Sequence, residues 1–371
     1  MGTRKGQMKE FRSILLFAAA AIVMAACSKV DLNHPDAEEI RFQVAGYHAS
    51  VASTKAPDDY KTGYGSVPFG AYAWYKGVNP EDNAVFMANE KVSYFTSDDF
   101  WTTEGATYYW PKWGSLDFIC YSPYSTTGVP AVDEGTITYG SWDVEAHPDV
   151  DLMYSDKATG LTDNLTTYYY SGVPVLFRHA LAKVAFTMRL AYAEMAPDTG
   201  DKTKWEVIVN SVELKNIRTK GSLGLTLENG AWVLPENRVW TPDNSKSDVS
   251  FDCSALQVFK STDPQSLSES MFVLPQRLDQ GQKIALNLTI KTWRDIGNGY
   301  PEEPFIQETS IELNATLSSS TIIAWGMNQS ITYNLILTPS QSTDGVKPVE
   351  ITFDPAEADW ETIELNTQIN I

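Results

Sequence analysis

The chain has 371 residues and carries 28 basic against 47 acidic side chains, a formal net charge of −19. A strongly basic face is the footprint of phosphate binding, so this balance excludes nucleic acid as a partner and is typical of a soluble extracellular protein. Apolar residues make up 43% of the sequence, enough for the cores of two ordinary domains.

Residues 1–26 have the pattern of an export signal. Four basic residues precede an apolar run over residues 14–26, and this run stops at Cys27. Such a run is read by the secretion machinery and is too short to cross a bilayer. The segment Met24-Ala25-Ala26-Cys27 resembles a lipobox, so we expect the signal peptide to be removed and Cys27 to be acylated, palmitate included. Ordinary cleavage near Ala26 is the alternative, and it leaves the cysteine unexplained.

The expected mature protein has 345 residues, with 24 basic and 46 acidic side chains and a net charge of −22. About three acyl chains, each buried CH₂ contributing roughly 0.8 kcal/mol, would tether it firmly to a membrane. Ser28, directly after the cysteine, favours transport to the outer membrane of a Gram-negative cell. The sequence therefore predicts a surface-exposed protein of the cell outer membrane, anchored by lipid.

The mature chain has an all-β pattern. Apolar residues recur at every second position, and no stretch of twelve or more residues keeps a helical period of 3.6. Turn-forming clusters separate these segments, which favours antiparallel strands joined by loops, as in β-sandwiches. The clearest alternations are Leu116/Phe118/Cys120, Val184/Phe186/Met188/Leu190, Ile284/Leu286/Leu288/Ile290 and Ile331/Tyr333/Leu335/Leu337.

Two domains of about 115 and 200 residues would divide this length sensibly, because one antiparallel core cannot grow indefinitely. We place the boundary near Ser171-Gly172. The predicted organisation is a signal peptide at 1–26, a lipidated segment with the first strand at 27–55, a β-sandwich at 56–171 and a second β-sandwich at 172–371.

The sequence contains no motif for catalysis, a cofactor or a metal. His179 has a strand-like apolar context and is expected to be a hydrogen-bonded structural residue. Asp149 and Asp151 lack the glycine and distal glutamate of a calcium loop, and are expected in a solvated turn. Cys120 and Cys253 are interpreted as small buried hydrophobes rather than a disulfide. We therefore predict that the protein is not an enzyme.

The aromatic side chains leave two interpretations open. Eleven Trp and eighteen Tyr could stack on sugars, as in glycan-binding surface lipoproteins, or fill the cores. The segment 108–113 leads directly into the strand that begins near Leu116. This position favours a packing corner over a sugar platform.

The first strand of the mature chain is predicted to be released. Ile40, Phe42 and Val44 alternate on one face, and an open stretch with Lys55-Ala56 follows. Loops of this kind are preferred protease sites. A cut after Lys55 would remove the strand together with the lipid, and the remaining sheet would have an unpaired edge and an apolar groove.

The C-terminal tail is predicted to be a donor strand that fills such a groove. Four aliphatic side chains and Thr367 alternate with polar residues from Ile363 to Ile371. Burying the four aliphatic ones would supply about 6 to 12 kcal/mol before the entropy of ordering is subtracted. Because donor and acceptor surfaces differ, the contact is head-to-tail and can give a filament. The alternative is that the tail is the last strand of its own domain. The donor positions are Ile363, Leu365, Ile369 and Ile371, with Thr367 between them.

These features together resemble the fimbrillins, or type V pilins, including the Mfa-like fimbrillin lipoproteins. The resemblance covers nearly the whole chain and rests on many short segments. They are Cys27 with its signal, the strand from Ile40 to Val44 with Thr54-Lys55-Ala56, Tyr109-Trp110-Pro111, Asp117-Phe118, Tyr121-Ser122-Pro123, Asp151-Leu152-Met153-Tyr154, Phe177-Arg178-His179-Ala180-Leu181-Ala182-Lys183-Val184, Leu274-Pro275-Gln276, Trp325-Gly326 and the strand from Ile351 to Trp360.

The resemblance implies two transthyretin-like β-sandwich domains, export as a lipoprotein, removal of the first strand by a surface protease, and donor-strand polymerisation into adhesive fimbriae. One position departs from the family pattern. The family's processing site is usually an arginine before a small residue, whereas Lys55 precedes Ala56 here. Either the maturation protease accepts lysine, or this subunit is not cut and stays at the base as an anchor.

The sequence thus predicts a structural fimbrial subunit whose partners are other fimbrial subunits, a maturation protease and the outer membrane. The alternatives are a fimbrial anchor subunit and a non-polymerising surface lipoprotein that binds glycans.

Overall fold

The computed structural model describes most of the chain between residues 38 and 362. The described ranges are 38–45, 67–97, 100–128, 130–163, 172–195, 202–243, 245–251, 257–267, 270–295, 297–319, 322–338, 350–353 and 361–362. Nearly all regular structure in these ranges is strand, and the two labelled helical turns, η2 (Pro80–Asp82) and η4 (Glu236–Arg238), have three residues each. The predicted all-β fold class is confirmed.

The first sheet contains strands from both ends of the N-terminal half. Its order is β2-β3-β4-β1-β10-β8-β5-β9, and β2 also pairs with β5, so the pairings form a closed circuit. Its strands are β1 (Phe42–Ala45), β2 (Phe69–Lys76), β3 (Ala84–Phe95), β4 (Phe100–Thr103), β5 (Ser115–Ser122), β8 (Met153–Ser155), β9 (Ala158–Leu161) and β10 (Val173–His179).

Two further sheets form a sandwich in the C-terminal half. One contains β11 (Ala182–Leu190), β19 (Gln265–Ser266), β20 (Met271–Val273), β25 (Gln329–Leu337), β26 (Glu350–Phe353) and β27 (Glu361–Thr362). The other contains β12 (Glu194–Met195), β13 (Lys202–Ile217), β17 (Ser247–Phe251), β18 (Gln257–Phe259), β22 (Lys283–Asp295) and β23 (Ile306–Thr316). A short pair, β21 (Gln276–Arg277) and β24 (Ala324–Trp325), completes this half.

The alternations predicted for this half are confirmed. Every second residue of β11 is buried, and the inward residues of β22 and β25 share its core. The two sheets therefore meet face to face, as expected when each strand presents one apolar face.

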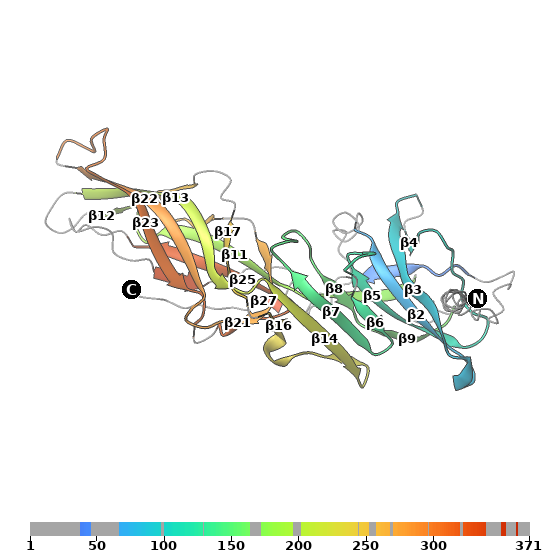
Figure 1. The fold of residues 1–371 in the computed structure, drawn as a ribbon. Coiled ribbons are helices and arrows are strands. Elements are labelled where there is room, and N and C mark those ends of the chain that lie inside the picture. The colour runs from blue at the N-terminus through green and yellow to red at the C-terminus, as the bar shows by residue number, and fades with distance from the viewer. Residues whose placement is uncertain are drawn as a thin grey trace, which may run out of the picture.

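A middle sheet connects the two halves. It consists of β6 (Ala131–Asp133), β7 (Thr136–Asp143), β14 (Lys220–Glu228), β15 (Ala231–Val233) and β16 (Thr241–Pro242), and β7 pairs with β14 although about 80 residues separate them. Figure 1 shows β7 and β14 between the blue-to-cyan strands at one end of the molecule and the orange-to-red strands at the other. The boundary near residues 171 and 172 stays a prediction, because this sheet draws strands from both sides of it.

The middle sheet has a hydrophobic core of its own. This core takes Ile119 and Tyr139 from the N-terminal half and Leu223 and Trp240 from the C-terminal half. The Trp240 indole N–H donates a hydrogen bond to the Ala180 carbonyl oxygen at 2.7 Å. The middle core explains why β5 is buried on both faces rather than on one. Its Leu116, Phe118 and Cys120 side chains enter the N-terminal core, as predicted, and Ile119 enters the middle core.

The prediction that the strands are antiparallel holds for most pairs and is wrong for three. β1 runs parallel to β10, β11 runs parallel to β25, and β27 runs parallel to β25. The partners of the first two pairs lie more than a hundred residues apart in the sequence. A parallel pair cannot be joined by a tight turn and needs a crossover of about a dozen residues or more. Short turns, which the sequence does signal, join only antiparallel neighbours.

Candidate functional site

The candidate site is the place that β1 occupies in the first sheet. β1 pairs with β10 in parallel from Phe42 opposite Val173 to Ala45 opposite Leu176, and it bridges β4 at Phe42 opposite Trp101. Within the described ranges no other strand joins β4 to β10. The circuit of the first sheet therefore closes through a strand of only four residues.

Main-chain hydrogen bonds hold the segment leading into β1 on both sides. The Ile40 N–H donates to the Tyr108 carbonyl oxygen at 2.8 Å, and the Trp110 N–H donates to the Glu38 carbonyl oxygen at 3.0 Å. On the opposite side, the Val173 N–H donates to the Arg41 carbonyl oxygen at 2.7 Å. Removal of residues 38–45 would leave each of these groups without its partner, and unpaired sheet edges favour the addition of another strand.

The side chains of the first strand fill the N-terminal core in the predicted pattern. Ile40 is 1% exposed and Phe42 is 3% exposed, and Val44 packs half-buried against the same cluster. The Phe42 ring contacts the Phe69 and Phe118 rings edge-on, with centroids 5.6 and 5.8 Å away. Burial of Ile40 and Phe42 at roughly 1.5 to 3 kcal/mol each corresponds to about 3 to 6 kcal/mol of hydrophobic stabilisation.

The walls around Phe42 and Ile40 are large and apolar, because they come from strands whose inward residues are aromatic or branched. Trp110 packs edge-on against Phe118 with centroids 6.0 Å apart, and Trp101 packs against Phe69. Val175 and Phe177 of β10 complete the same buried cluster. We call the space taken by Ile40, Phe42 and Val44 the β1 groove. It offers apolar pockets at alternate positions and backbone groups along both sides, which are the two requirements for binding an extended peptide.

The other predicted functional residues lie outside the described ranges. These are Cys27 for lipid attachment, Lys55 and Ala56 for processing, and Ile363, Leu365, Ile369 and Ile371 of the tail. The last described strand, β27, ends at Thr362, and it pairs with Gln329 and Ser330 of β25. The chain thus enters the tail from the C-terminal sheet.

The histidine and aspartate expectations have mixed outcomes. The His179 Nδ1 lies 2.8 Å from Asp151 Oδ2, and both side chains are largely buried. His179 is therefore a structural residue, as predicted, held by this contact and by the hydrogen bond that its backbone N–H donates to Asn328 Oδ1 at 3.4 Å. Asp149 is exposed, also as predicted, whereas Asp151 is the partner of His179 rather than a member of a solvated turn. No group of three or more potential metal ligands occurs within the described residues.

The cysteine and aromatic predictions can be followed for Cys120 and for residues 108–113. Cys120 is buried without a disulfide, and burial raises the pKa of its thiol, so it packs as a small hydrophobe. Cys253 lies outside the described ranges. Trp110 is buried and supports the packing-corner interpretation, but Trp113 is 68% exposed. No helix in the described part of the chain is long and apolar enough to cross a membrane.

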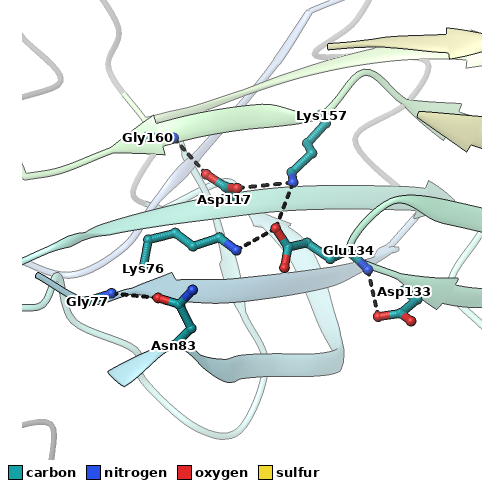
Figure 2. A network of polar contacts seen from close by, with 8 residues as sticks. All are labelled: Lys76, Gly77, Asn83, Asp117, Asp133, Glu134, Lys157 and Gly160. Atoms are coloured by element: carbon teal, nitrogen blue, oxygen red, sulfur yellow. Dashed lines mark hydrogen bonds and ion pairs between the residues drawn. The ribbon is translucent and has the colours of Figure 1, made fainter. Parts of the chain in front are cut away.

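A network of charged side chains links β2 and β5 of the first sheet to the turn between β6 and β7, and the sequence analysis missed it. The Lys157 ammonium, with a side chain only 7% exposed, lies 3.1 Å from Asp117 Oδ2 and 3.2 Å from Glu134 Oε1. Figure 2 shows how Lys76 reaches the same Glu134 oxygen. The hydrogen bond from Lys76, with a further one from Lys157, holds the pKa of Glu134 below its ordinary value.

The network ties together segments that are distant in sequence. Asp117 lies in β5 and accepts a hydrogen bond from the Gly160 N–H of β9 at 2.8 Å, whereas Lys76 ends β2. The network pairs two lysine ammonium groups with two carboxylates. A buried ion pair is favourable only when all of its charged groups have partners. The only sequence signal was the presence of Asp117 inside an apolar run, which is uncommon for an unpaired carboxylate. The network is a structural brace and has no arrangement suited to catalysis.

Comparison with known proteins gives one family match. The sequence model of the fimbrillin-like family matches residues 54–360. None of the curated proteins matches the sequence.

Several solved structures align with most of the chain. A candidate cell adhesion protein of Bacteroides uniformis has 16% identity and a TM-score of 0.46, with 88% of this chain and 98% of that chain covered. A fimbrial assembly protein of Parabacteroides distasonis has 10% identity and a TM-score of 0.33, again with 88% and 98% covered.

Proposed function

Since the chain belongs to the fimbrillin-like family, a family of non-enzymatic proteins of cell-surface fimbriae, we propose that it is a fimbrial structural subunit that polymerises by donor-strand exchange. In this proposal the precursor is exported as a lipoprotein anchored through Cys27 to the outer membrane. A protease then removes the first strand, and the tail of a neighbouring subunit takes its place in the β1 groove.

The observation that carries the proposal is the position of β1. Four residues close the circuit of the first sheet, and the residues on the inward face, Ile40 and Phe42, are almost fully buried. Loss of this strand opens an apolar groove between β4 and β10 that has hydrogen-bonding groups on both sides. A groove of this kind favours a replacement strand with the same alternation of side chains.

The proposed donor has that alternation. The tail places apolar residues at 363, 365, 369 and 371 with polar residues between them, which matches the spacing of Ile40, Phe42 and Val44. Since donor and acceptor are different surfaces, each subunit can accept one tail and donate another. Repetition of this head-to-tail contact gives an open polymer of identical subunits.

The proposed processing site lies at a suitable place along the chain. Lys55 and Ala56 fall between the end of β1 at Ala45 and the start of β2 at Phe69. A cut there separates the whole first strand and the lipid from every other strand of the first sheet. The enzyme in this proposal is a surface protease that accepts lysine.

A single charge in the tail tests the exchange. The variant Leu365→Asp would place an unpaired carboxylate in an apolar groove, which is costly enough to prevent assembly. The matched control is Asn366→Asp, which adds the same charge at the neighbouring position that faces away from the groove. We expect no fibres from the first variant and normal fibres from the second, as seen by electron microscopy of sheared surface material. Normal fibres from Leu365→Asp would contradict donor-strand exchange through the tail.

A further inference from the structure

A second hollow lies apart from the β1 groove, where the end of β5, the loop that follows it and β7 come together. Its volume is about 640 Å³. Tyr124, Tyr139 and Trp142 contribute aromatic surface, and Ser125, Thr127 and Ser141 contribute hydroxyl groups. The volume falls within the roughly 300 to 1,000 Å³ that is usual for small-molecule sites. A lining of aromatic surface with a few polar groups is also typical of such sites.

The walls of this hollow are held by hydrogen bonds. The Tyr121 hydroxyl donates to Asn89 Oδ1 at 2.6 Å and accepts from the Ser125 N–H at 3.3 Å. The Tyr124 N–H donates to the Pro68 carbonyl oxygen at 2.7 Å, and the Tyr139 hydroxyl donates to the Met153 carbonyl oxygen at 2.9 Å. A hollow fixed in this way loses little conformational entropy when a ligand enters it.

Trp142 presents the most suitable surface for a ring. It is half-buried in β7, and the exposed His147 imidazole stacks on it with centroids 4.6 Å apart and an angle of 27° between the planes. The Trp142 indole N–H has no hydrogen-bond partner in the described part of the chain. The indole nitrogen is buried and His147 covers part of the ring, so Trp142 and the exposed His147 ring together offer a ligand aromatic surface but no indole donor.

The charges of the lining restrict the class of ligand. No lysine or arginine lines the hollow, and its single carboxylate, Asp143, is paired with Lys220 at 3.0 Å. The protein as a whole is strongly acidic. A phosphate, a sulfate or a sialic acid would find no cation here and would be repelled by the surrounding field. A neutral ring with hydroxyl groups fits both the aromatic faces and the uncharged hydrogen-bonding groups.

We propose that this hollow binds a neutral saccharide, with Trp142 as the stacking platform. Ser125, Thr127 and Ser141 would supply hydrogen bonds at its rim. This proposal goes beyond strand exchange, because none of these residues lies in the β1 groove. Adhesive contact and polymerisation would then use different surfaces of the same subunit.

The test is titration of the full mature chain with neutral oligosaccharides built from glucose, galactose, mannose or N-acetylglucosamine, followed by calorimetry and saturation-transfer NMR. We expect saturable binding of at least one of them, weakened about tenfold or more in Trp142→Ala and only severalfold in Trp142→Phe. The matched control Trp113→Ala removes an exposed tryptophan elsewhere on the surface and should bind as tightly as the wild type.

Two further comparisons separate binding from folding and from assembly. If Trp142→Ala melts at a clearly lower temperature, Tyr124→Ala and Trp142→Phe replace it in the comparison. Fibre formation by the Trp142 variants should be normal, so failure of this proposal is distinguishable from failure of strand exchange. Absence of saturable binding, binding of acidic saccharides alone, or equal binding by the wild type and Trp142→Ala would each overturn the proposal.

Discussion

Gly172 lies so close to Arg41 that a Cβ atom added to Gly172 would stand 2.8 Å from the Arg41 carbonyl oxygen. The three nearest contacts are backbone atoms of Arg41 and Phe42, and backbone cannot move aside as a flexible side chain can. This close approach sets β1 directly against β10.

Gly172→Ala is expected to push β1 away from β10. Overpacking of this kind typically costs about 1 to 3 kcal/mol in the free energy of unfolding. The measurement is thermal or urea unfolding of the uncut precursor, together with amide hydrogen exchange of residues 42–45. Gly224→Ala is the matched control, because nothing lies within 4 Å of a Cβ at that position. Equal stability and equal exchange in the two variants would show that β1 is not held at Gly172.

Phe42→Ala should destabilise the precursor and leave fibres unaffected. Replacement of a buried phenylalanine by alanine costs about 3 to 5 kcal/mol, and Phe42 belongs to the strand that is discarded in the proposed maturation. The control is Phe177→Ala in β10, which lines the same core and is retained after the cut. Melting of the precursors and heat resistance of sheared fibres are the two measurements. Fibres weakened by Phe42→Ala would mean that β1 remains in the assembled subunit.

Lys55→Gln should prevent release of the first strand if the maturation protease cuts after Lys55. Lys55→Arg keeps the positive charge and restores the usual residue of the family, so it should still be cut. Western blots of surface material would show the uncut mass for the first variant and the shorter mass for the second. Normal processing of Lys55→Gln would place the cut elsewhere.

Acid should weaken the brace around Glu134. The pKa of Glu134 is lowered in the folded protein, so its ionised form contributes stability above its ordinary value of 4.5, and this contribution is lost as the pH falls through the folded pKa. The difference in melting temperature between the wild type and Glu134→Gln should be constant from about pH 7 to pH 5.5 and should shrink below 4.5. A difference that stays constant down to pH 3 would rule out this role of Glu134.

The sequence predicted the elements whose pattern depends on local alternation. The alternating apolar residues of β11, β22 and β25 are buried because each strand turns one face to the C-terminal core. β5 departed from this rule, since Ile119 on its other face enters the middle core. That core exists only because β7 and β14 pair across a long stretch of chain, and no local pattern encodes such a pairing.

The part of the candidate site that shows as local alternation was predicted, and the part that depends on distant contacts was not. The alternation of Ile40, Phe42 and Val44 identified the first strand, and the structure confirms that Ile40 and Phe42 are buried. Its parallel partner, β10, and the closing of the circuit through Trp101 could not be predicted, because they depend on contacts between distant segments. The Lys157 brace and the hollow beside Trp142 were missed on similar grounds, since their residues come together only in the folded chain.

The most direct test of strand exchange is the N-terminus of the subunit within fibres. Sheared surface material would be examined by electron microscopy, and the subunit from the same fraction by intact mass and N-terminal sequencing. The account predicts filaments whose subunits begin at Ala56 and lack the first strand. Subunits that still begin at lipidated Cys27, with no filaments in the fraction, would contradict it.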